Sequence, residues 1–249
     1  MKYKPEEEKL LMTELWSPVI KDNPLNFVKF VFPWGMKDTP LEEFKGPRKW
    51  QEKILREMTI HIQRNGIKDL PEMFRMAVAS GRGIGKSALV AWIILWMLST
   101  RLGSTVIVTA NTEQQLRSRT WAELGKWLTL SLNSHWWSKT ATTIKPAAWF
   151  DEALERDLKI DTGYYYAQAQ LWSEENPDAV AGIHSSYGVC LIMDEASGIP
   201  APIYSVSEGF FSEPTPNRFW FTFSNPRRNQ GPFYDSFHSA KAFWKNEQI

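Results

Sequence analysis

The stretch FRMAVASGRGIGKS, residues 74–87, decides the fold. Residues 74–79 are mostly apolar and predict a buried strand, and residues 80–86 form a short glycine-rich turn. An apolar helix is predicted from Ser87 to about Thr100. A strand, a turn that closes on Gly-Lys-Ser and a helix in direct succession are the layout of a phosphate-binding loop.

The residues of this turn suit a polyphosphate. Gly81 and Gly83 allow backbone N–H groups to point inward, and the helix adds its positive dipole end. Lys86 would reach the β- and γ-phosphate oxygens, and Ser87 would place its hydroxyl on Mg²⁺. Ser80 stands where the pattern has its first glycine, so the strict pattern fails by one residue. The predicted contacts of a nucleotide are Ser80, Gly81, Arg82, Gly83, Ile84, Gly85, Lys86, Ser87 and Ala88.

An acidic pair follows another apolar strand, which is predicted over residues 187–193. Asp194 would hold Mg²⁺, mostly through a bound water, and Glu195 would polarise the water that attacks the γ-phosphate. An isolated Asp-Glu pair after a strand is usually a solvated turn. The phosphate-loop pattern earlier in the same chain favours the catalytic interpretation.

Two further motifs are candidates for the same site. Residues 218–223 predict a strand that ends in Ser224-Asn225, whose side chains could sense a γ-phosphate; a simple Ser-Asn-Pro turn is the alternative. Trp50-Gln51 lies in a helix predicted over residues 47–65. The glutamine amide could form two hydrogen bonds to an adenine edge, with Trp50 stacking nearby, although such a pair is more often ordinary helix surface.

The order of the predicted elements indicates an α/β fold with a mostly parallel central sheet flanked by helices. Residues 105–110 predict a strand, residues 113–130 a helix with Thr112 as its N-cap, and residues 140–175 strand-and-turn material. We expect residues 1–66 to form a helical lead-in broken by prolines, with Glu6-Glu7-Glu8 as a solvated helix face. Residues 67–249 are expected to form the core.

Composition narrows the function classes. Lys and Arg number 29 against 28 Asp and Glu, which excludes a uniformly basic nucleic-acid binder. The single cysteine, Cys190, suits a reducing compartment and is expected to be an unreactive residue packed in the core. With one cysteine and histidines that show no ligand spacing, no zinc site is expected. The longest apolar run, residues 88–98, is about half of the ~20 residues that a membrane span requires. A cytoplasmic protein without membrane contact is expected.

Taken together, the motifs resemble the ATPase domain of the large terminase subunit of tailed bacteriophages. The arginine within the phosphate loop is the most specific of them. The stretches that carry the resemblance are residues 26–34, Trp50-Gln51, residues 80–87, residues 109–112 with Gln114-Gln115, Gly182-Ile183-His184, Asp194-Glu195, and Ser224-Asn225-Pro226 with Gly231.

The resemblance implies a P-loop NTPase of the ASCE, RecA-like type that uses ATP and Mg²⁺. Glu195, Arg82 and Lys86 would be catalytic, Ser87 and Asp194 would hold the metal, and the Ser224-Asn225 pair would couple hydrolysis to DNA movement. It further implies a homo-oligomeric, pentameric ring that docks on a portal protein, works with a small terminase subunit, and drives double-stranded DNA into a procapsid in the host cytoplasm. The chain ends before the family's nuclease domain, so we expect a fragment without nuclease activity.

Other functions compete with this one. A superfamily 2 helicase-like translocase shares the motifs, but its second RecA-like domain is missing here and Asp194-Glu195 is followed by Ala-Ser. A non-hydrolytic nucleotide-dependent assembly module is the second alternative, and a small-molecule kinase, which would need a lid of clustered arginines, is the third. Candidate DNA contacts, each of which could equally be plain solvent-facing charge, are Arg117, Arg119, Arg227, Arg228, Lys241 and Lys245.

Overall fold

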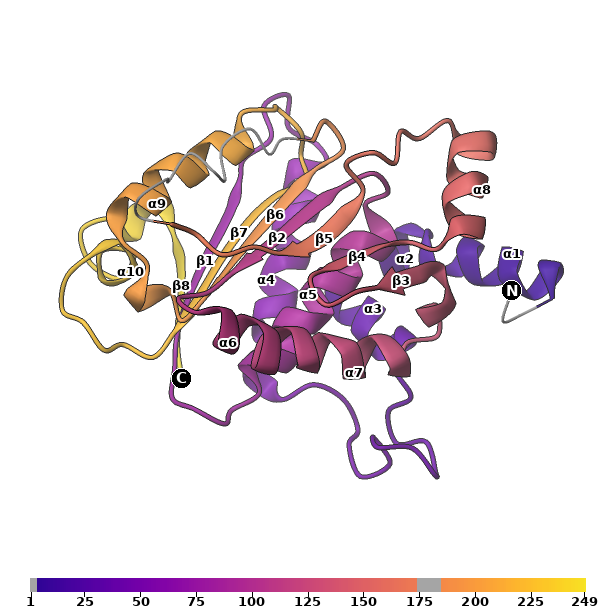
Figure 1. The fold of residues 1–249 in the computed structure, drawn as a ribbon, viewed down its shortest axis with the longest axis horizontal. Coiled ribbons are helices and arrows are strands. Elements are labelled where there is room, and N and C mark those ends of the chain that lie inside the picture. The colour runs from indigo at the N-terminus through magenta and orange to yellow at the C-terminus, as the bar shows by residue number, and fades with distance from the viewer. Residues whose placement is uncertain (1–3, 174–184) are drawn as a thin grey trace.

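The computed structural model describes residues 4–173 and 185–249, and within them eight strands form one sheet in the order β3-β4-β5-β2-β6-β7-β1-β8 (Figure 1). Neighbours from β5 to β8 pair in parallel, while β3 and β4 form an antiparallel edge. This confirms the predicted α/β fold with a mostly parallel sheet. The strands are β1 (Phe74–Ala79), β2 (Thr105–Thr109), β3 (Trp137–Lys139), β4 (Thr143–Pro146), β5 (Tyr166–Ala169), β6 (Val189–Asp194), β7 (Arg218–Ser224) and β8 (Lys245–Gln248).

The register of the central strands aligns their carboxyl ends. Ala79 of β1 lies opposite Ser224 of β7, and Asp194 of β6 lies opposite Phe223 of β7. Strand β7 therefore separates the strand before the phosphate loop from the strand that ends in the acidic pair. Residues 80–87, 194–195 and 224–225, which are far apart in sequence, follow strands that end side by side.

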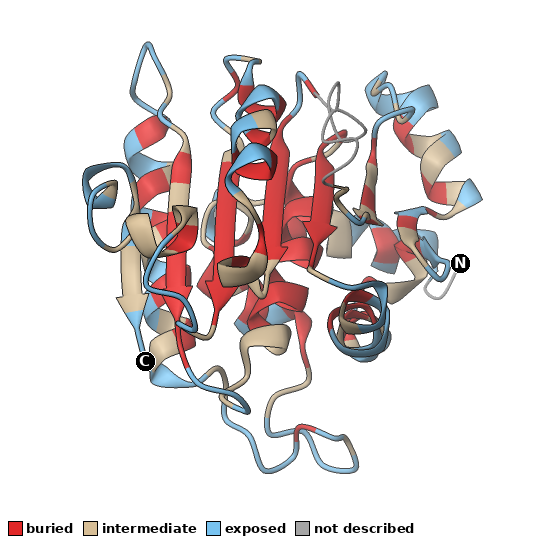
Figure 2. Cartoon of the chain, turned by 60° about the vertical axis from the view of Figure 1, so that its left-hand side comes forward, coloured by how far each residue is buried: buried red, intermediate tan, exposed pale blue. Residues whose placement is uncertain are grey.

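Helices cover both faces of the sheet, because side chains of successive strand residues point to opposite faces. In β1, Met76 and Val78 join the larger core with α3, α4 and α5, while Ala77 and Ala79 join a smaller core with α9 and α10. Figure 2 shows the central strands buried between these layers. The helices are α1 (Pro5–Leu15), α2 (Pro18–Lys21), α3 (Pro24–Val31), α4 (Lys49–Asn65), α5 (Lys86–Thr100), α6 (Glu113–Gln115), α7 (Ala122–Leu130), α8 (Ala148–Leu158), α9 (Ala201–Ser207) and α10 (Pro232–Asp235), with short turns η1 (Leu116–Trp121), η2 (Ser134–Trp136), η4 (Ala196–Gly198), η5 (Glu208–Phe211) and η6 (Lys241–Phe243).

Helix α5 anchors the phosphate loop in the core. Every residue from Leu89 to Thr100 is buried, including Trp92 and Trp96. A helix that is apolar on all sides requires packing all around it, and α5 has the sheet on one side and α3 and α7 against it. The loop thus emerges directly from a rigid strand and a rigid helix.

Short helices occupy the region before β1, and Pro5, Pro18 and Pro24 each lie at the first position of one, where a missing N–H costs nothing. The prediction of a solvated Glu6-Glu7-Glu8 face is wrong for Glu8, which is 3% exposed. Its carboxylate accepts a hydrogen bond from Trp136 Nε1 and lies 2.7 Å from His135 Nε2. Packing of α1 against the η2 turn buries this one face of the helix.

Two further predictions of local structure need correction. The helix over residues 113–130 begins as predicted, with Thr112 Oγ1 accepting from Gln115 N, but a π-helical segment, η1, interrupts it. Residues 140–175 are not only strands and turns, because α8 lies within them and buries Phe150 and Leu154 at a four-residue spacing. Within the described ranges, no helix is long and apolar enough to cross a bilayer.

Candidate functional site

The phosphate loop follows β1 in the conformation that its glycines permit. Gly83 and Gly85 have φ of +72° and +95°, in the left-handed region that side chains disfavour. A Cβ on Gly85 would also lie 3.0 Å from the amide nitrogen of Gln51, a tight contact that favours glycine there in addition to its positive φ. Ser80, at the position of the pattern's missing glycine, is buried and its N–H bonds to the carbonyl of Ser224.

The Lys86 ammonium bridges the mouth of this loop. Its Nζ donates to the carbonyls of Ser80 (3.2 Å) and Gly81 (2.9 Å) and to Oδ1 of Asn225 (3.2 Å). Burial lowers the pKa of Lys86, and the nearby carboxylates of Glu195 and Asp194 raise it in part. All its partners inside the loop are neutral oxygens, for which phosphate oxygens would be stronger substitutes.

The Asp194 carboxylate is held at the end of β6. Its Oδ2 accepts from Thr120 Oγ1 at 2.6 Å, and its Oδ1 accepts from the N–H of Glu195 at 3.0 Å. Burial raises the pKa of Asp194, an effect that a bound cation would oppose. Thr120 belongs to the π-helical segment η1, and nothing in the sequence pattern singled it out.

Glu195 adopts a left-handed backbone conformation, with φ of 53°. Its carbonyl accepts from Asn111 Nδ2 at 3.0 Å, just beyond the end of β2. A Cβ on Gly198 would lie 2.2 Å from that same nitrogen, so the glycine makes room for Asn111. Non-glycine residues take this conformation only where their surroundings enforce it, and such positions gather at functional sites. Asn111 lies in the stretch 109–112 that resembles the terminase sequences, and the sequence alone predicts no individual role for it.

The end of β7 connects the lysine to the acidic turn. Asn225 accepts from Lys86, while Ser224 Oγ accepts from the N–H of Ser197 at 3.1 Å and lies 2.8 Å from Ser197 Oγ. Ser197 lies two residues after Glu195. The predicted sensor pair thus contacts both the loop lysine and the segment that carries the acidic pair.

Gln51 is bound within the protein. It is 3% exposed, its Nε2 donates to the Gly85 carbonyl at 2.9 Å, and its Oε1 accepts from Arg48 N at 2.8 Å. Arg48 in turn donates to the Ile84 carbonyl. Both ends of the amide that was expected at an adenine edge are thus engaged, and their contact is with the phosphate loop. Trp50 packs partly buried against the core.

A cavity of about 430 Å³ collects much of the predicted site. Its lining residues are Arg82, Gly83, Gly85, Lys86, Ser87, Ala88, Arg119, Glu123, Asp194 and Glu195. Arg119, expected as a DNA contact, is therefore at this cavity, and Glu123 was not singled out at all. The predicted residues outside its lining are Trp50, Gln51, Ser80, Gly81, Ile84, Ser224 and Asn225.

The remaining predicted residues lie elsewhere. Arg227 and Arg228 line a neighbouring cavity with Tyr234 and His238, and Lys245 pairs with Glu57. The Gly182-Ile183-His184 motif falls outside the described residues.

Comparison with known proteins finds similarity to large terminases of phages. No family model matches. A curated relative, the probable large terminase subunit of Enterobacteria phage P7, is 29% identical over 170 residues, covering 65% of this chain. The chain spans about a third of that relative's length (31%).

Solved structures share the fold. The large terminase of bacteriophage HK97 matches over 92% of this chain and 43% of its own, with a TM-score of 0.58 and 13% identity. The ATPase domain of the Thermus phage P74-26 large terminase, in a mutant form, matches over 82% of this chain and 81% of its own, with a TM-score of 0.52 and 16% identity. The chain is thus similar in sequence to a phage large terminase and has the α/β P-loop fold of the large-terminase ATPase domains, as its motifs predicted.

Proposed function

We propose that this chain is the ATP-hydrolysing motor domain of a large terminase subunit, which moves double-stranded DNA into a procapsid. One observation carries the proposal: a single cavity presents the loop lysine Lys86, Arg82 and the Asp194-Glu195 pair together. Phosphate binding, metal binding and activation of water each require one of these groups within reach of the others.

The donor set suits Mg²⁺. Ser87 offers a hydroxyl and Asp194 a carboxylate, and hard oxygen donors of this kind are those that Mg²⁺ prefers. Asp194 is partly buried and burial raises the pKa of its carboxyl group, so a cation would stabilise its charged form. When bound, the metal would neutralise charge on the β- and γ-phosphates.

Glu195 is the proposed general base. A water held by its carboxylate attacks the γ-phosphorus in line, the bond to the β–γ bridging oxygen breaks, and Glu195 takes the proton. ADP and inorganic phosphate result. Arg82, which has no hydrogen bond or ion pair within the described part of the chain, would offset the charge that develops on the transferred phosphoryl group, and Lys86 would bind its oxygens.

The hydrogen bonds around Lys86 suggest how hydrolysis is coupled to movement. A γ-phosphate that binds Lys86 would compete with Asn225 for the ammonium. Asn225 and Ser224 are adjacent, and Ser224 contacts Ser197 beyond the base. Loss and return of the phosphate would then change the position of β7's end relative to the acidic turn.

The broader setting is proposed from similarity. It comprises a pentameric ring on a portal protein, a small terminase subunit and a location in the host cytoplasm. The division into a lead-in over residues 1–66, with Trp50-Gln51 near the adenine, and a core over residues 67–249 belongs to the same proposal. Arg227 and Arg228, which follow the coupling pair, are the proposed DNA contacts.

Calorimetric titration of ATP with Mg²⁺ into the wild-type chain and Lys86→Ala tests nucleotide binding. We expect the substitution to weaken binding by at least about tenfold, because a charge-assisted contact to phosphate is lost. Lys145→Ala, which removes an exposed lysine from strand β4, is the matched control and should bind as wild type does. Equal affinity of wild type and Lys86→Ala would refute the assigned loop.

A further inference from the structure

Arg119 shares a cavity with the phosphate loop although it comes from a different element. The loop and the start of α5 form part of the lining, the acidic pair forms another part, and Arg119 and Glu123 contribute from η1 and α7. A nucleotide whose phosphates lie on the loop would therefore have a guanidinium beside it that the phosphate-loop pattern does not include.

The backbone beside Arg119 is held in place by the neighbouring residue. Thr120 is fully buried, and its Oγ1 donates to Asp194 Oδ2 at 2.6 Å. This bond ties η1 to the end of β6, so the backbone of Arg119 lies one residue from a contact with the proposed metal ligand. The γ-phosphate belongs at this acidic end of the site, next to the metal and the base.

The helix is irregular at this point. Residues Leu116–Trp121 form a π-helix, whose wider turn shifts the side chains that follow relative to a regular α-helix. Such single turns are found frequently at functional sites, where they direct particular side chains. Here the turn supplies both the Thr120 bond to Asp194 and the neighbouring arginine.

The charge of Arg119 is uncompensated, in contrast to that of its neighbour Arg117. Arg117 pairs with Glu113 at 2.8 Å, whereas Arg119 has no hydrogen bond or ion pair within residues 4–173 and 185–249. Glu123, the nearest carboxylate along the helix, already accepts from Trp127 Nε1 and Lys126 Nζ. A guanidinium free of protein partners at the edge of a phosphate site is suited to bind phosphate oxygens in a bidentate manner.

We propose that Arg119 is a second arginine of the site and binds the terminal phosphate of the bound nucleoside triphosphate. The inference rests on the proposed function and adds a residue to it. It assigns the two exposed arginines of η1 to different tasks: Arg117 closes a surface ion pair, and Arg119 distinguishes a triphosphate from a diphosphate.

The test compares two nucleotides across three forms of the full chain. Affinities for ADP and for a non-hydrolysable ATP analogue, each with Mg²⁺, are measured for wild type, Arg119→Ala and Arg117→Ala. We expect Arg119→Ala to bind the triphosphate about tenfold more weakly, as loss of a charge-assisted hydrogen bond implies, and ADP within about twofold of wild type. Arg117→Ala, the matched control, should bind both nucleotides as wild type does.

Several outcomes would overturn the inference. Unchanged triphosphate affinity in Arg119→Ala refutes it, and an equal loss for both nucleotides refutes the assignment to the terminal phosphate. A loss confined to DNA affinity would show a DNA contact instead. If Arg119→Ala fails to fold by circular dichroism, Arg119→Gln takes its place. Failure of wild type to bind either nucleotide would refute the proposed function itself, whereas wild-type binding that depends on Lys86 but not on Arg119 refutes only this inference.

Discussion

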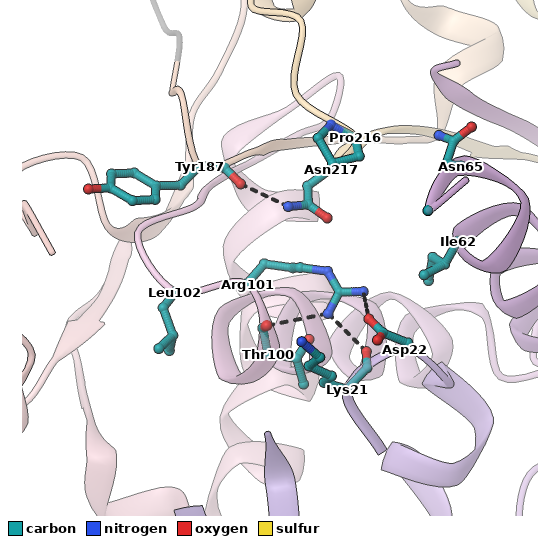
Figure 3. A pocket seen from close by; sticks show the side chains of 11 residues that line it. Lys21, Asp22, Ile62, Asn65, Thr100, Arg101, Leu102, Tyr187, Pro216 and Asn217 are labelled. Carbon is teal, nitrogen blue, oxygen red and sulfur yellow. Dashed lines mark hydrogen bonds and ion pairs between the residues drawn. The ribbon is translucent and has the colours of Figure 1, made fainter. Parts of the chain in front are cut away.

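Two cavities at opposite ends of the sheet both contain arginine, and they use it differently. One lies at the carboxyl ends of the strands and holds Arg82 and Arg119. The other, about 370 Å³, lies where β2, β6 and β7 begin, and Arg101 projects into it (Figure 3).

At the amino-end cavity the cation is part of the packing. Arg101 is 7% exposed and donates to the carbonyl of Lys21 and to Asp22 Oδ1, both at 2.9 Å, and to the carbonyl of Thr100 at 3.3 Å (Figure 3). Its guanidinium also lies 4.8 Å from the ring centre of Trp96. These contacts join α2 of the lead-in to the end of α5.

The contrast separates a structural cation from a binding one. Arg101 is neutralised by a carboxylate and bonded to backbone oxygens, so an incoming anion would gain little from it. At the carboxyl end, Arg82 and Arg119 have no protein partner in the part of the chain that the structure describes, and Lys86 contacts neutral oxygens alone. Burial of a charged group therefore does not distinguish the proposed site here, because Arg101 is deeply buried and its charge is already compensated by Asp22.

The largest expected effect lies at the carboxyl end. Glu195→Gln should lower ATP turnover by about 10²–10⁴-fold, the contribution of a general base, while leaving the affinity for ATP near that of wild type. Single-turnover hydrolysis at saturating Mg²⁺, with calorimetric titration beside it, measures the two quantities separately. Hydrolysis at the wild-type rate would remove Glu195 from the mechanism and weaken the contrast between the two ends.

Arg101→Ala should have the opposite effect, lowering stability without changing the affinity for ATP. It leaves Asp22 Oδ1 without its cationic partner and removes one hydrogen bond each from the carbonyls of Thr100 and Lys21, of which Lys21 still accepts from Trp96 Nε1. We therefore expect the free energy of unfolding to fall by about 3 kcal/mol. Affinity for ATP in the folded fraction should not change. Urea unfolding measures the first quantity and titration the second. A variant that is as stable as wild type but binds ATP poorly would invert the assignment of the two cavities.

Much of the candidate site at the carboxyl ends of the strands could be predicted from the sequence, whereas little of the cavity at their amino ends could be. Glycine spacing and the acidic pair are local in sequence, and parallel strands bring such segments to one edge of a sheet. Arg101 gave no such signal, because its partners Lys21 and Asp22 lie about 80 residues away in the lead-in. Only the packing of α2 against α5 brings them together.

The residues whose surroundings the sequence did not predict have the same cause. Glu8 was expected in solvent because three glutamates in a row usually are, and its burial depends on His135 and Trp136 far along the chain. Thr120 and Arg119 acquire their places from a π-helical turn, which the apolar period of the helix does not reveal. The local sequence pattern predicted the strands whose ends hold the candidate site residues. Tertiary packing determines which other residues contact them.

A smaller effect concerns pH and the amino-end cavity. His61 lies in α4, with its Nε2 3.0 Å from the amide nitrogen of Asn65, a residue that lines this cavity. Its ring packs against Phe74 and Phe219, and burial lowers the pKa of His61 from 6.5 to about 4. The native state thus holds His61 neutral in a pH range where the unfolded chain protonates it.

The sign of the pH dependence follows from that difference. Because the folded-state pKa is depressed, the contribution of His61 to stability is complete above pH 6.5 and is lost as the pH falls from 6.5 towards 4. Between pH 7.5 and 5 we expect wild type to lose about 1–2 kcal/mol more unfolding free energy than His61→Gln, whose side chain does not titrate. Urea unfolding of both forms at the two pH values measures this, and the carboxylates common to both cancel in the comparison. Equal losses would mean that His61 is protonated without cost in the native state, and the amino end would then contain a site open to solvent and ions, like the carboxyl end.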